Sequence, residues 1–268
     1  MLRDFKTYEE QIEILESRGM IVPNKEEAIQ FLERNSYYNV INAYKDIFLD
    51  KMVPVEKFKN GVTFDNVRAL WSFDKYLRNE LFRYIIIVER NIKSKLAHFI
   101  SKRYGTNNYL DINNFDSKHK DAAKNLAEAI ISEEKKQISK NNEMIKHYEN
   151  KYNFIPFWVL VNILSFGQIS KFYEYINNSF QSEVAKDISR QLNRTLFPDE
   201  IIRSLKTINL IRNLCAHDQR VFDLEQSKKE ISPRICQRDS VKNRLSQQLA
   251  KIKVYRREMI FRHCFAVL

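Results

Sequence analysis

The longest regular hydrophobic pattern in the chain lies between residues 63 and 103. Apolar residues recur there every three or four positions, a spacing that places them on one face of a helix. The segment contains no glycine or proline, and Thr63 is a suitable N-cap at its start. The apolar stripe consists of Val67, Leu70, Trp71, Leu77, Leu81, Tyr84, Ile85, Val88, Ile92, Leu96 and Phe99. We therefore predict one long central helix of about 60 Å, which needs a bundle partner or a second subunit along much of its length.

Shorter helical patterns precede this segment. Thr7 is followed three residues later by Glu10, and Asn24 by Glu27, spacings that mark the starts of helices. Gly19 is a suitable stop for the first of them. We expect two short helices at the N-terminal end of the chain.

The second half of the chain contains three further helical regions. Residues 117–149 are highly charged with a weak apolar pattern, which favours a solvated helical face or a mobile arm. Pro156 opens a compact apolar segment, which we expect Gly167 to divide into two helices. Pro198 and the two acidic residues after it start a helix that we expect to run to about His217.

Composition supports an all-helical protein. The 268 residues include only 4 glycines and 5 prolines, which favours long helices over strands and turns. We predict an all-α helical bundle around the long central helix. Its expected parts are an N-terminal helical and aromatic segment packed on the main domain (residues 1–60), a main helical domain (61–226) and a basic C-terminal tail (227–268).

The charge of the chain favours a polyanionic partner. The formal net charge is +11, and residues 228–268 carry 11 basic and 3 acidic side chains, so 11 − 3 = +8 of it lies there. Nucleic acid or an anionic membrane surface would fit, although the same balance is found in basic soluble proteins without such a partner. Lys251, Lys253, Arg256 and Arg257 are candidate contacts to RNA phosphates. Alternatively, the tail is a solvated extension, or it packs on the bundle.

Several classes of protein are disfavoured. The N-terminus is charged from the start, unlike a signal peptide, and the longest aliphatic run, residues 85–88, is too short to span a bilayer. We expect a cytoplasmic protein without a membrane partner. Three dispersed cysteines give no disulfide framework, and the phosphate-loop, dinucleotide, HExxH and paired CxxC motifs are absent from the sequence. We expect no metal and no cofactor.

The segment with candidate chemistry has the sequence IRNLCAHDQR, residues 211–220. Arg212 falls near the centre of an apolar stripe, whereas Asn213 and His217, four residues apart, share another face. Metal-free RNA cleavage needs a group that moves a proton, for which histidine titrates in the right range, and a cation for the phosphate charge, for which the fork of arginine is suited. An amide can orient either partner. Alternatively, the arginine is an ion-paired structural residue and the histidine a helix C-cap. Glu89, in a mostly apolar stretch of the long helix, is either a partner that neutralises Arg212 or an ordinary surface charge.

Four segments of the chain, in the right order, resemble one protein family. RNLCAH matches the R-x4-6-H motif of HEPN RNases, and RNLCAHDQR resembles the RNxxAHxxR signature of the Abi-like (abortive infection, AbiD/AbiF) family. The other three segments are SYYNVINAYKDIF, similar to its YY…GY…F segment, LWSFDKYLRNELFRYIIIVE, similar to its LYxFDxxLRxxxxxxIExIE helix, and PFWVLVNILSFGQISKFY, similar to its PxWxxxexxSFGxLSxxY block. The resemblance covers about residues 8–225. The chain departs from it at Asn42, where the family often has glycine, and at Asp218, Gln219 and Asp223.

The resemblance implies an all-α HEPN-like core and a metal-independent endoribonuclease that acts as an abortive-infection or toxin-type effector in phage defence. Its product would be a 2′,3′-cyclic phosphate, and its active site would be built from two motifs across a homodimer. By position in the signature, Arg212, Asn213 and His217 would be catalytic, with Asp218 and Arg220 in support. A regulatory or antitoxin RNA is a conceivable further partner.

Other readings stay open at this stage. The first alternative to an endoribonuclease is a non-catalytic RNA-binding helical module that can form a complex with a regulatory RNA. The second is a helical interaction protein in which Arg212 is structural. The pair Arg90 and His98 resembles the Arg212 to His217 string with a longer spacing, and we interpret it as coincidence or as a support face. Tyr37, Tyr38 and Tyr44 either stack on unpaired bases or pack in the core.

Overall fold

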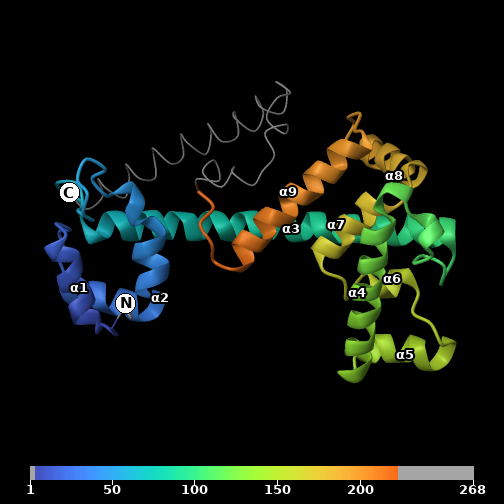
Figure 1. Ribbon diagram of the computed structural model, residues 1–268, viewed down its shortest axis with the longest axis horizontal. Helices are drawn as coiled ribbons and strands as arrows, with labels where there is room; N and C mark the ends of the chain where they lie inside the picture. Colours follow the sequence, from blue (N-terminus) through green and yellow to red (C-terminus); the bar gives the residue numbers. More distant parts are fainter. Residues whose placement is uncertain (1–3, 223–268) are drawn as a thin grey trace. The chain divides into compact units, whose positions relative to one another are not determined.

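The computed structural model describes residues 4–222, and the regular elements of this part of the chain are helices (Figure 1). The α-helices are α1 (Tyr8–Ser17), α2 (Lys25–Asn35), α3 (Phe64–Tyr104), α4 (Lys120–Ser139), α5 (Glu143–Tyr152), α6 (Phe157–Leu160), α7 (Phe166–Tyr175), α8 (Asn178–Gln191) and α9 (Pro198–Ala216). The short π and 3-10 turns are η1 (Tyr38–Asn42), η2 (Lys45–Ile47), η3 (Ile112–Asn114) and η4 (Ser117–His119). The all-α expectation is therefore confirmed.

The chain divides into two compact units. Unit 1 comprises Met1–Asn79 with the segment that begins at Asp218, and unit 2 comprises Glu80–His217. Helix α3 contributes its first part to unit 1 and the rest to unit 2. The candidate RNA contacts Lys251, Lys253, Arg256 and Arg257 lie outside the described residues.

The N-terminal helices of unit 1 begin at the caps that the sequence predicts. The Thr7 hydroxyl accepts the N–H of Glu10 at 3.3 Å, and the Glu10 carboxylate accepts the N–H of Thr7 at 2.8 Å, which completes a capping box. The Asn24 side chain accepts the N–H of Glu27 at 3.1 Å. The core of the unit consists of Ile12, Leu15, Met20, Val22, Ala28, Leu32, Val40, Ile41, Tyr44, Phe58, Val62, Phe64, Val67 and Leu70.

The long helix is present as predicted. Helix α3 spans Phe64–Tyr104, one residue displaced from the predicted range, and the Thr63 hydroxyl accepts the N–H of Asn66 at 3.2 Å near its start. Its absence of internal glycine and proline explains why it continues through 41 residues. In the described part of the chain, no helix is both long enough and apolar enough to cross a lipid bilayer.

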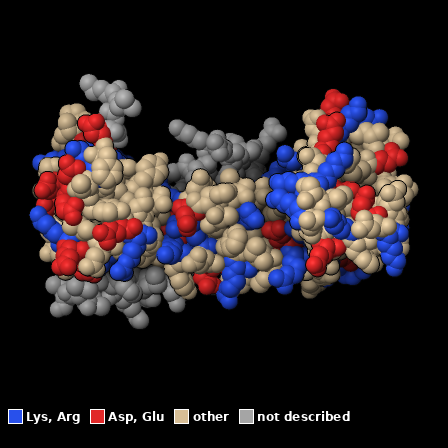
Figure 2. Space-filling view, turned by 90° about the horizontal axis from the view of Figure 1, so that it is seen from below, with Lys and Arg blue, Asp and Glu red and all other residues tan. Residues whose placement is uncertain are grey.

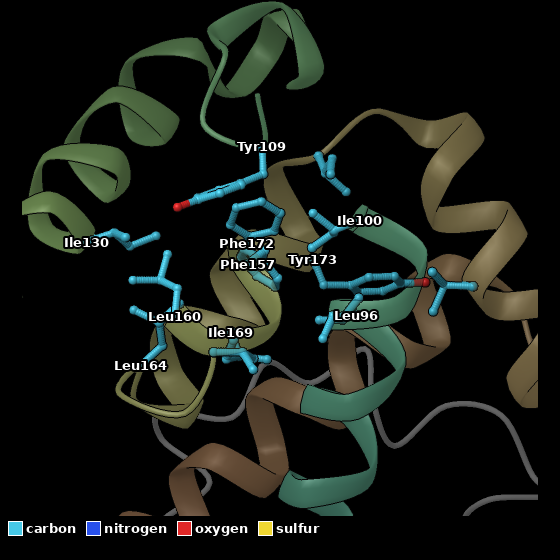
Figure 3. Close-up of a cluster of buried hydrophobic side chains, with 14 of the residues drawn as sticks. Leu96, Ile100, Tyr109, Ile130, Phe157, Leu160, Leu164, Ile169, Phe172 and Tyr173 are labelled. Carbon is cyan, nitrogen blue, oxygen red and sulfur yellow. The ribbon is translucent and has the colours of Figure 1, made fainter. Parts of the chain in front are cut away.

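Unit 2 is built around an aromatic core (Figure 3). Helices α4 and α9 both pack against α7, and the end of α3 closes the cluster. The residues at its centre include Leu96, Ile100, Tyr109, Ile130, Phe157, Leu160, Leu164, Ile169, Phe172 and Tyr173. The Tyr109 hydroxyl donates to the carbonyl of Ile155 at 2.6 Å, so this buried polar group is satisfied within the core.

Two expectations about unit 2 are wrong. Of the two alternatives for residues 117–149, the mobile arm is wrong, because α4 buries Ala123, Leu126 and Ile130 against α7. The solvated helical face is present on the other side of α4, where Lys124 and Glu128 are exposed. Gly167 does not divide its segment; it lies inside α7, where a Cβ would come within 3.4 Å of the Asn209 side chain of α9. The division lies at residues 161–165, and Ser165 begins α7 with a capping box.

Helix α8 was not predicted. Its buried positions, from Phe180 through Val184 to Ile188, recur every four residues, so a helical signal was present. The Gln181 side-chain amide donates to the carbonyls of Tyr173 and Ile176, each at 3.0 Å. These bonds satisfy carbonyl groups that the end of α7 leaves without a helical partner.

Candidate functional site

The candidate signature occupies the last turn of α9 and the residues after it. The helix starts with Pro198 at its first position, and the N–H of Phe197 donates to the Glu200 carboxylate at 3.0 Å. It ends at Ala216, and the N–H of His217 donates to the carbonyl of Asn213 at 3.0 Å. Arg212 and Asn213 are therefore helical, whereas His217 is the residue at which the chain leaves the helix.

Arg212 lies against Glu89 of α3. Its Nε is 4.0 Å from Oε2 of Glu89, and the Cζ lies 5.8 Å from the centroid of the Phe82 ring. The other oxygen of Glu89 is 2.9 Å from Lys93 Nζ. Glu89 is buried, and of the two alternatives for this residue the structure shows the pairing with Arg212. The guanidinium is thus held between a carboxylate and an aromatic ring.

The rest of the Arg212 side chain stays accessible. Its exposed fraction is 33%, and within residues 4–222 its η nitrogens make no hydrogen bond. Only Nε is both buried and without a hydrogen-bond partner in the described structure. A planar cation that is fixed on one side and open on the other can bind an anion with two parallel hydrogen bonds.

Asn213 and His217 are both exposed. In the described part of the chain, neither side chain makes a hydrogen bond, so the amide and the imidazole are accessible to a ligand. Arg212 and His217 are separated by about 140° around the helix and about 7.5 Å along it. Ideal helix geometry therefore places the two positions on different sides of α9.

The two supporting residues of the signature belong to unit 1. Asp218, with φ of 53°, lies with one carboxylate oxygen 3.6 Å from Nε of Arg78. Arg220 donates to the carbonyl of Ala43 at 2.8 Å and to the Asp46 carboxylate at 2.7 Å. Their contacts attach the segment after the signature to elements of unit 1.

A buried polar cluster in unit 1 was missed by sequence reasoning. Tyr44, Asp74 and Arg78 are each at most 3% exposed. The Tyr44 hydroxyl donates to the Asp74 carboxylate at 2.6 Å, and Arg78 donates to the same carboxylate at 2.6 Å and to the hydroxyl at 3.0 Å. Asp74 also accepts the backbone N–H of Val221 at 3.2 Å. Burial, and then the hydrogen bond to Asp74, raise the pKa of Tyr44 well above its ordinary range, so it remains the donor.

The signal for this cluster was present in the sequence. Asp74 and Arg78 stand at the aspartate and arginine of the FDxxLR string, and Tyr44 stands in the aromatic N-terminal segment. Of the three tyrosines considered for base stacking, Tyr44 is a core residue, whereas Tyr38 is 72% exposed. Core packing is therefore the outcome for Tyr44.

Charges of both signs share the described surface. In the face shown in Figure 2, basic and acidic side chains alternate, and the basic ones group most closely right of centre. Within residues 4–222 there is no group of three or more His, Cys, Asp or Glu side chains that would hold a metal ion.

Comparison with known proteins gives one family. The sequence model of the family described as Abi-like protein matches residues 30–223. The comparisons with curated proteins and with solved structures gave no match. The matched range contains both the buried cluster of unit 1 and the Glu89 and Arg212 pair of unit 2.

Proposed function

This chain belongs to the Abi-like protein family, and from that premise we propose that it acts in abortive infection as a metal-independent endoribonuclease of the HEPN type. One observation carries the proposal: the guanidinium of Arg212 is fixed by Glu89 and Phe82 but remains open to an anion, five residues before an exposed histidine.

The roles of the side chains follow from their chemistry. In the cleavage step the ribose 2′-oxygen forms a bond to phosphorus and the bond from phosphorus to the 5′-oxygen breaks, which leaves a 2′,3′-cyclic phosphate and a 5′-hydroxyl. His217 would take the 2′-hydroxyl proton or give a proton to the leaving 5′-oxygen. Arg212 would stabilise the charge that develops on the phosphorane, and Asn213 would orient the phosphate or the imidazole.

A homodimer supplies what a single chain lacks. Because Arg212 and His217 lie on different sides of one helix, an isologous pair that brings two signatures together would surround one phosphate with both kinds of side chain. Part of α3 has apolar side chains available for such an interface, since Tyr84 and Ile87 are each 58% exposed.

The decisive experiment is cleavage of total RNA in EDTA. Wild-type protein is compared with His217→Ala and Arg212→Ala, and with His147→Ala as the control for loss of an exposed histidine elsewhere in unit 2. We expect cleavage to persist in EDTA, to fall about a hundredfold or more in the first two variants and to be unchanged in the control. Loss of cleavage in EDTA, or full activity of His217→Ala, contradicts the proposal.

A second function is favoured by the net charge. An excess of +11 suits a non-catalytic RNA-binding module that holds a regulatory or antitoxin RNA. In that case the protein binds RNA with a strong salt dependence, and RNA incubated with it shows no new 5′-hydroxyl ends.

A further inference from the structure

Unit 2 contains a groove beside the candidate site. Its volume is about 880 Å3. One wall is a face of α3 that includes Arg90, His98 and Lys102, and the other wall includes Trp158 of α6. Arg90 and His98 therefore line the same cavity. From the sequence, this pair was interpreted as a coincidence or as a support face.

The charged side chains of this groove are mostly basic. The lining includes three basic side chains and one carboxylate, that of Glu89; the basic ones are Arg90, Lys93 and Lys102. Glu89 is paired with Lys93, and the contact of Lys102 with Glu183 is 3.7 Å long between exposed side chains, so it is easily exchanged. Arg90 makes no ion pair or hydrogen bond with any residue of the described chain. Two cations are thus available for phosphate groups.

An aromatic ring and an unpartnered hydroxyl complete the lining. Trp158 is 41% exposed although it lies next to the aromatic core of the unit. The Ser101 Oγ is buried and has no hydrogen-bond partner in the described structure. An exposed indole offers a stacking surface for a base, and a buried hydroxyl without a partner calls for a polar ligand.

The groove adjoins the candidate catalytic arginine. Glu89 lines it and is also the residue that holds Arg212. From Glu89 to Lys102, α3 rises about 20 Å, enough for a few nucleotides of an extended strand to reach Arg212.

We propose that this groove binds a single-stranded segment of the RNA substrate, with one base stacked on Trp158 and phosphates at Arg90 and Lys102. The strand is single because a paired base cannot expose its face to an indole. This inference rests on the proposed function in taking RNA as the ligand, and it adds the path by which RNA approaches Arg212.

The test uses a fluorescein-labelled oligonucleotide without 2′-hydroxyl groups, which the proposed chemistry cannot cleave. Its affinity for the full chain is measured by anisotropy over a range of salt concentrations. We expect Trp158→Ala to weaken binding about tenfold. We expect Arg90→Ala with Lys102→Ala to lower the slope of log affinity against log salt by about 1.4, the loss of two phosphate contacts. The matched control, Lys135→Ala with Lys140→Ala, removes two exposed charges of unit 2 outside the groove and keeps the wild-type slope.

A second measurement reports on the groove alone. The chain has two tryptophans, so Trp71→Phe leaves Trp158 as the sole indole. Saturable quenching of its fluorescence by the unlabelled oligonucleotide supports the groove. Quenching without cleavage of natural RNA supports the groove and overturns the catalytic proposal. Cleavage that depends on His217 while Trp158 shows no quenching and Trp158→Ala binds normally overturns the groove and leaves the catalytic proposal standing.

Discussion

The Nε of Arg212 lies 4.0 Å from Oε2 of Glu89, and neither atom has a hydrogen-bond partner within residues 4–222. This separation is too long for a direct hydrogen bond, so the attraction is between charges. The same carboxylate also forms an ion pair with Lys93 at 2.9 Å, so Glu89 is the counter-charge of two cations. Its attraction orients the Arg212 guanidinium. In the proposed mechanism Glu89 would therefore position Arg212.

We predict that Glu89→Gln lowers kcat for RNA cleavage about tenfold and changes KM by less than threefold. The amide keeps the shape of the side chain but removes the charge that orients Arg212, and orientation matters most when charge develops in the transition state. Steady-state kinetics on a defined RNA separate the two constants. A loss confined to KM, or wild-type kinetics, contradicts the positioning role.

The control for Glu89→Gln is Glu133→Gln. Glu133 pairs with Lys136 on the surface of α4, at 3.5 Å. The substitution removes one carboxylate from the same unit, and this carboxylate has no contact with Arg212. We expect unchanged kinetics in this variant, and we expect Glu89→Asp, which keeps the charge, to recover part of the lost kcat.

The buried cluster of unit 1 gives a prediction about stability. Asp74→Asn removes the buried counter-charge of the Arg78 guanidinium, which is 3% exposed, and leaves it only the exposed Asp218 carboxylate at 3.6 Å. Breaking a buried pair in this way costs about 3–5 kcal/mol of unfolding free energy. Tyr44→Phe removes both hydrogen bonds of the hydroxyl, the one to Asp74 and the one from Arg78, and should cost about 1–3 kcal/mol. Urea denaturation followed by circular dichroism measures both. The surface variant Asp65→Asn, which loses an exposed contact with Arg68, should change stability by less than about 0.5 kcal/mol.

Local signals predicted most of the helices. Thr7 with Glu10 and Thr63 before the long stripe each mark a helix start that depends on a few neighbouring residues, and both starts are as expected. Gly167 was misread because its smallness serves the approach of Asn209 on α9, a contact between residues far apart in sequence. The mobile-arm alternative for α4 was wrong because a weak apolar pattern does not say which residues will be covered by another helix.

The sequence names candidate residues for the site, and their catalytic role stays a prediction; their contacts were harder to foresee. Arg212 and His217 follow from their chemistry and spacing, and Glu89 was considered as a partner because it is a carboxylate in an apolar stretch. The bond from Val221 to Asp74 joins segments that no periodicity relates, and it was not foreseen. Such long-range pairing is decided by the tertiary fold.

A pH-dependent prediction concerns Glu134 of α4. Burial, and then repulsion from Glu149, raise the pKa of this carboxyl above its ordinary value. A raised folded pKa stabilises the fold below the unfolded pKa, about 4.5, and this contribution is lost as pH rises through the folded pKa. Ionised Glu134 therefore destabilises the protein at pH 7.

We expect Glu134→Gln to raise Tm by about 1–2 °C at pH 7, with a gain that shrinks toward zero as the pH falls to 4. The effect is small because the side chain is only half-buried. Calorimetric melts at pH 4, 5.5 and 7 measure it. Glu128→Gln, on the exposed side of the same helix, is the control and should show no such trend. A gain that grows on acidification would reverse the sign and refute the prediction.

The last prediction concerns the homodimer proposed above. Ile87 is 58% exposed on α3, beside the partly exposed Val88. An isologous interface would bury this position in both copies, so a charge placed there would disfavour the interface twice. We expect Ile87→Glu to be a monomer by light scattering and to cleave RNA at least tenfold more slowly, because two signatures no longer meet. Ile131→Glu is the matched control, since Ile131 is 40% exposed on α4, and this variant should remain dimeric and active. If Ile87→Glu were a monomer with full activity, each chain would carry a complete site. Arg212 and His217 of the same chain would then have to reach one phosphate from different sides of α9.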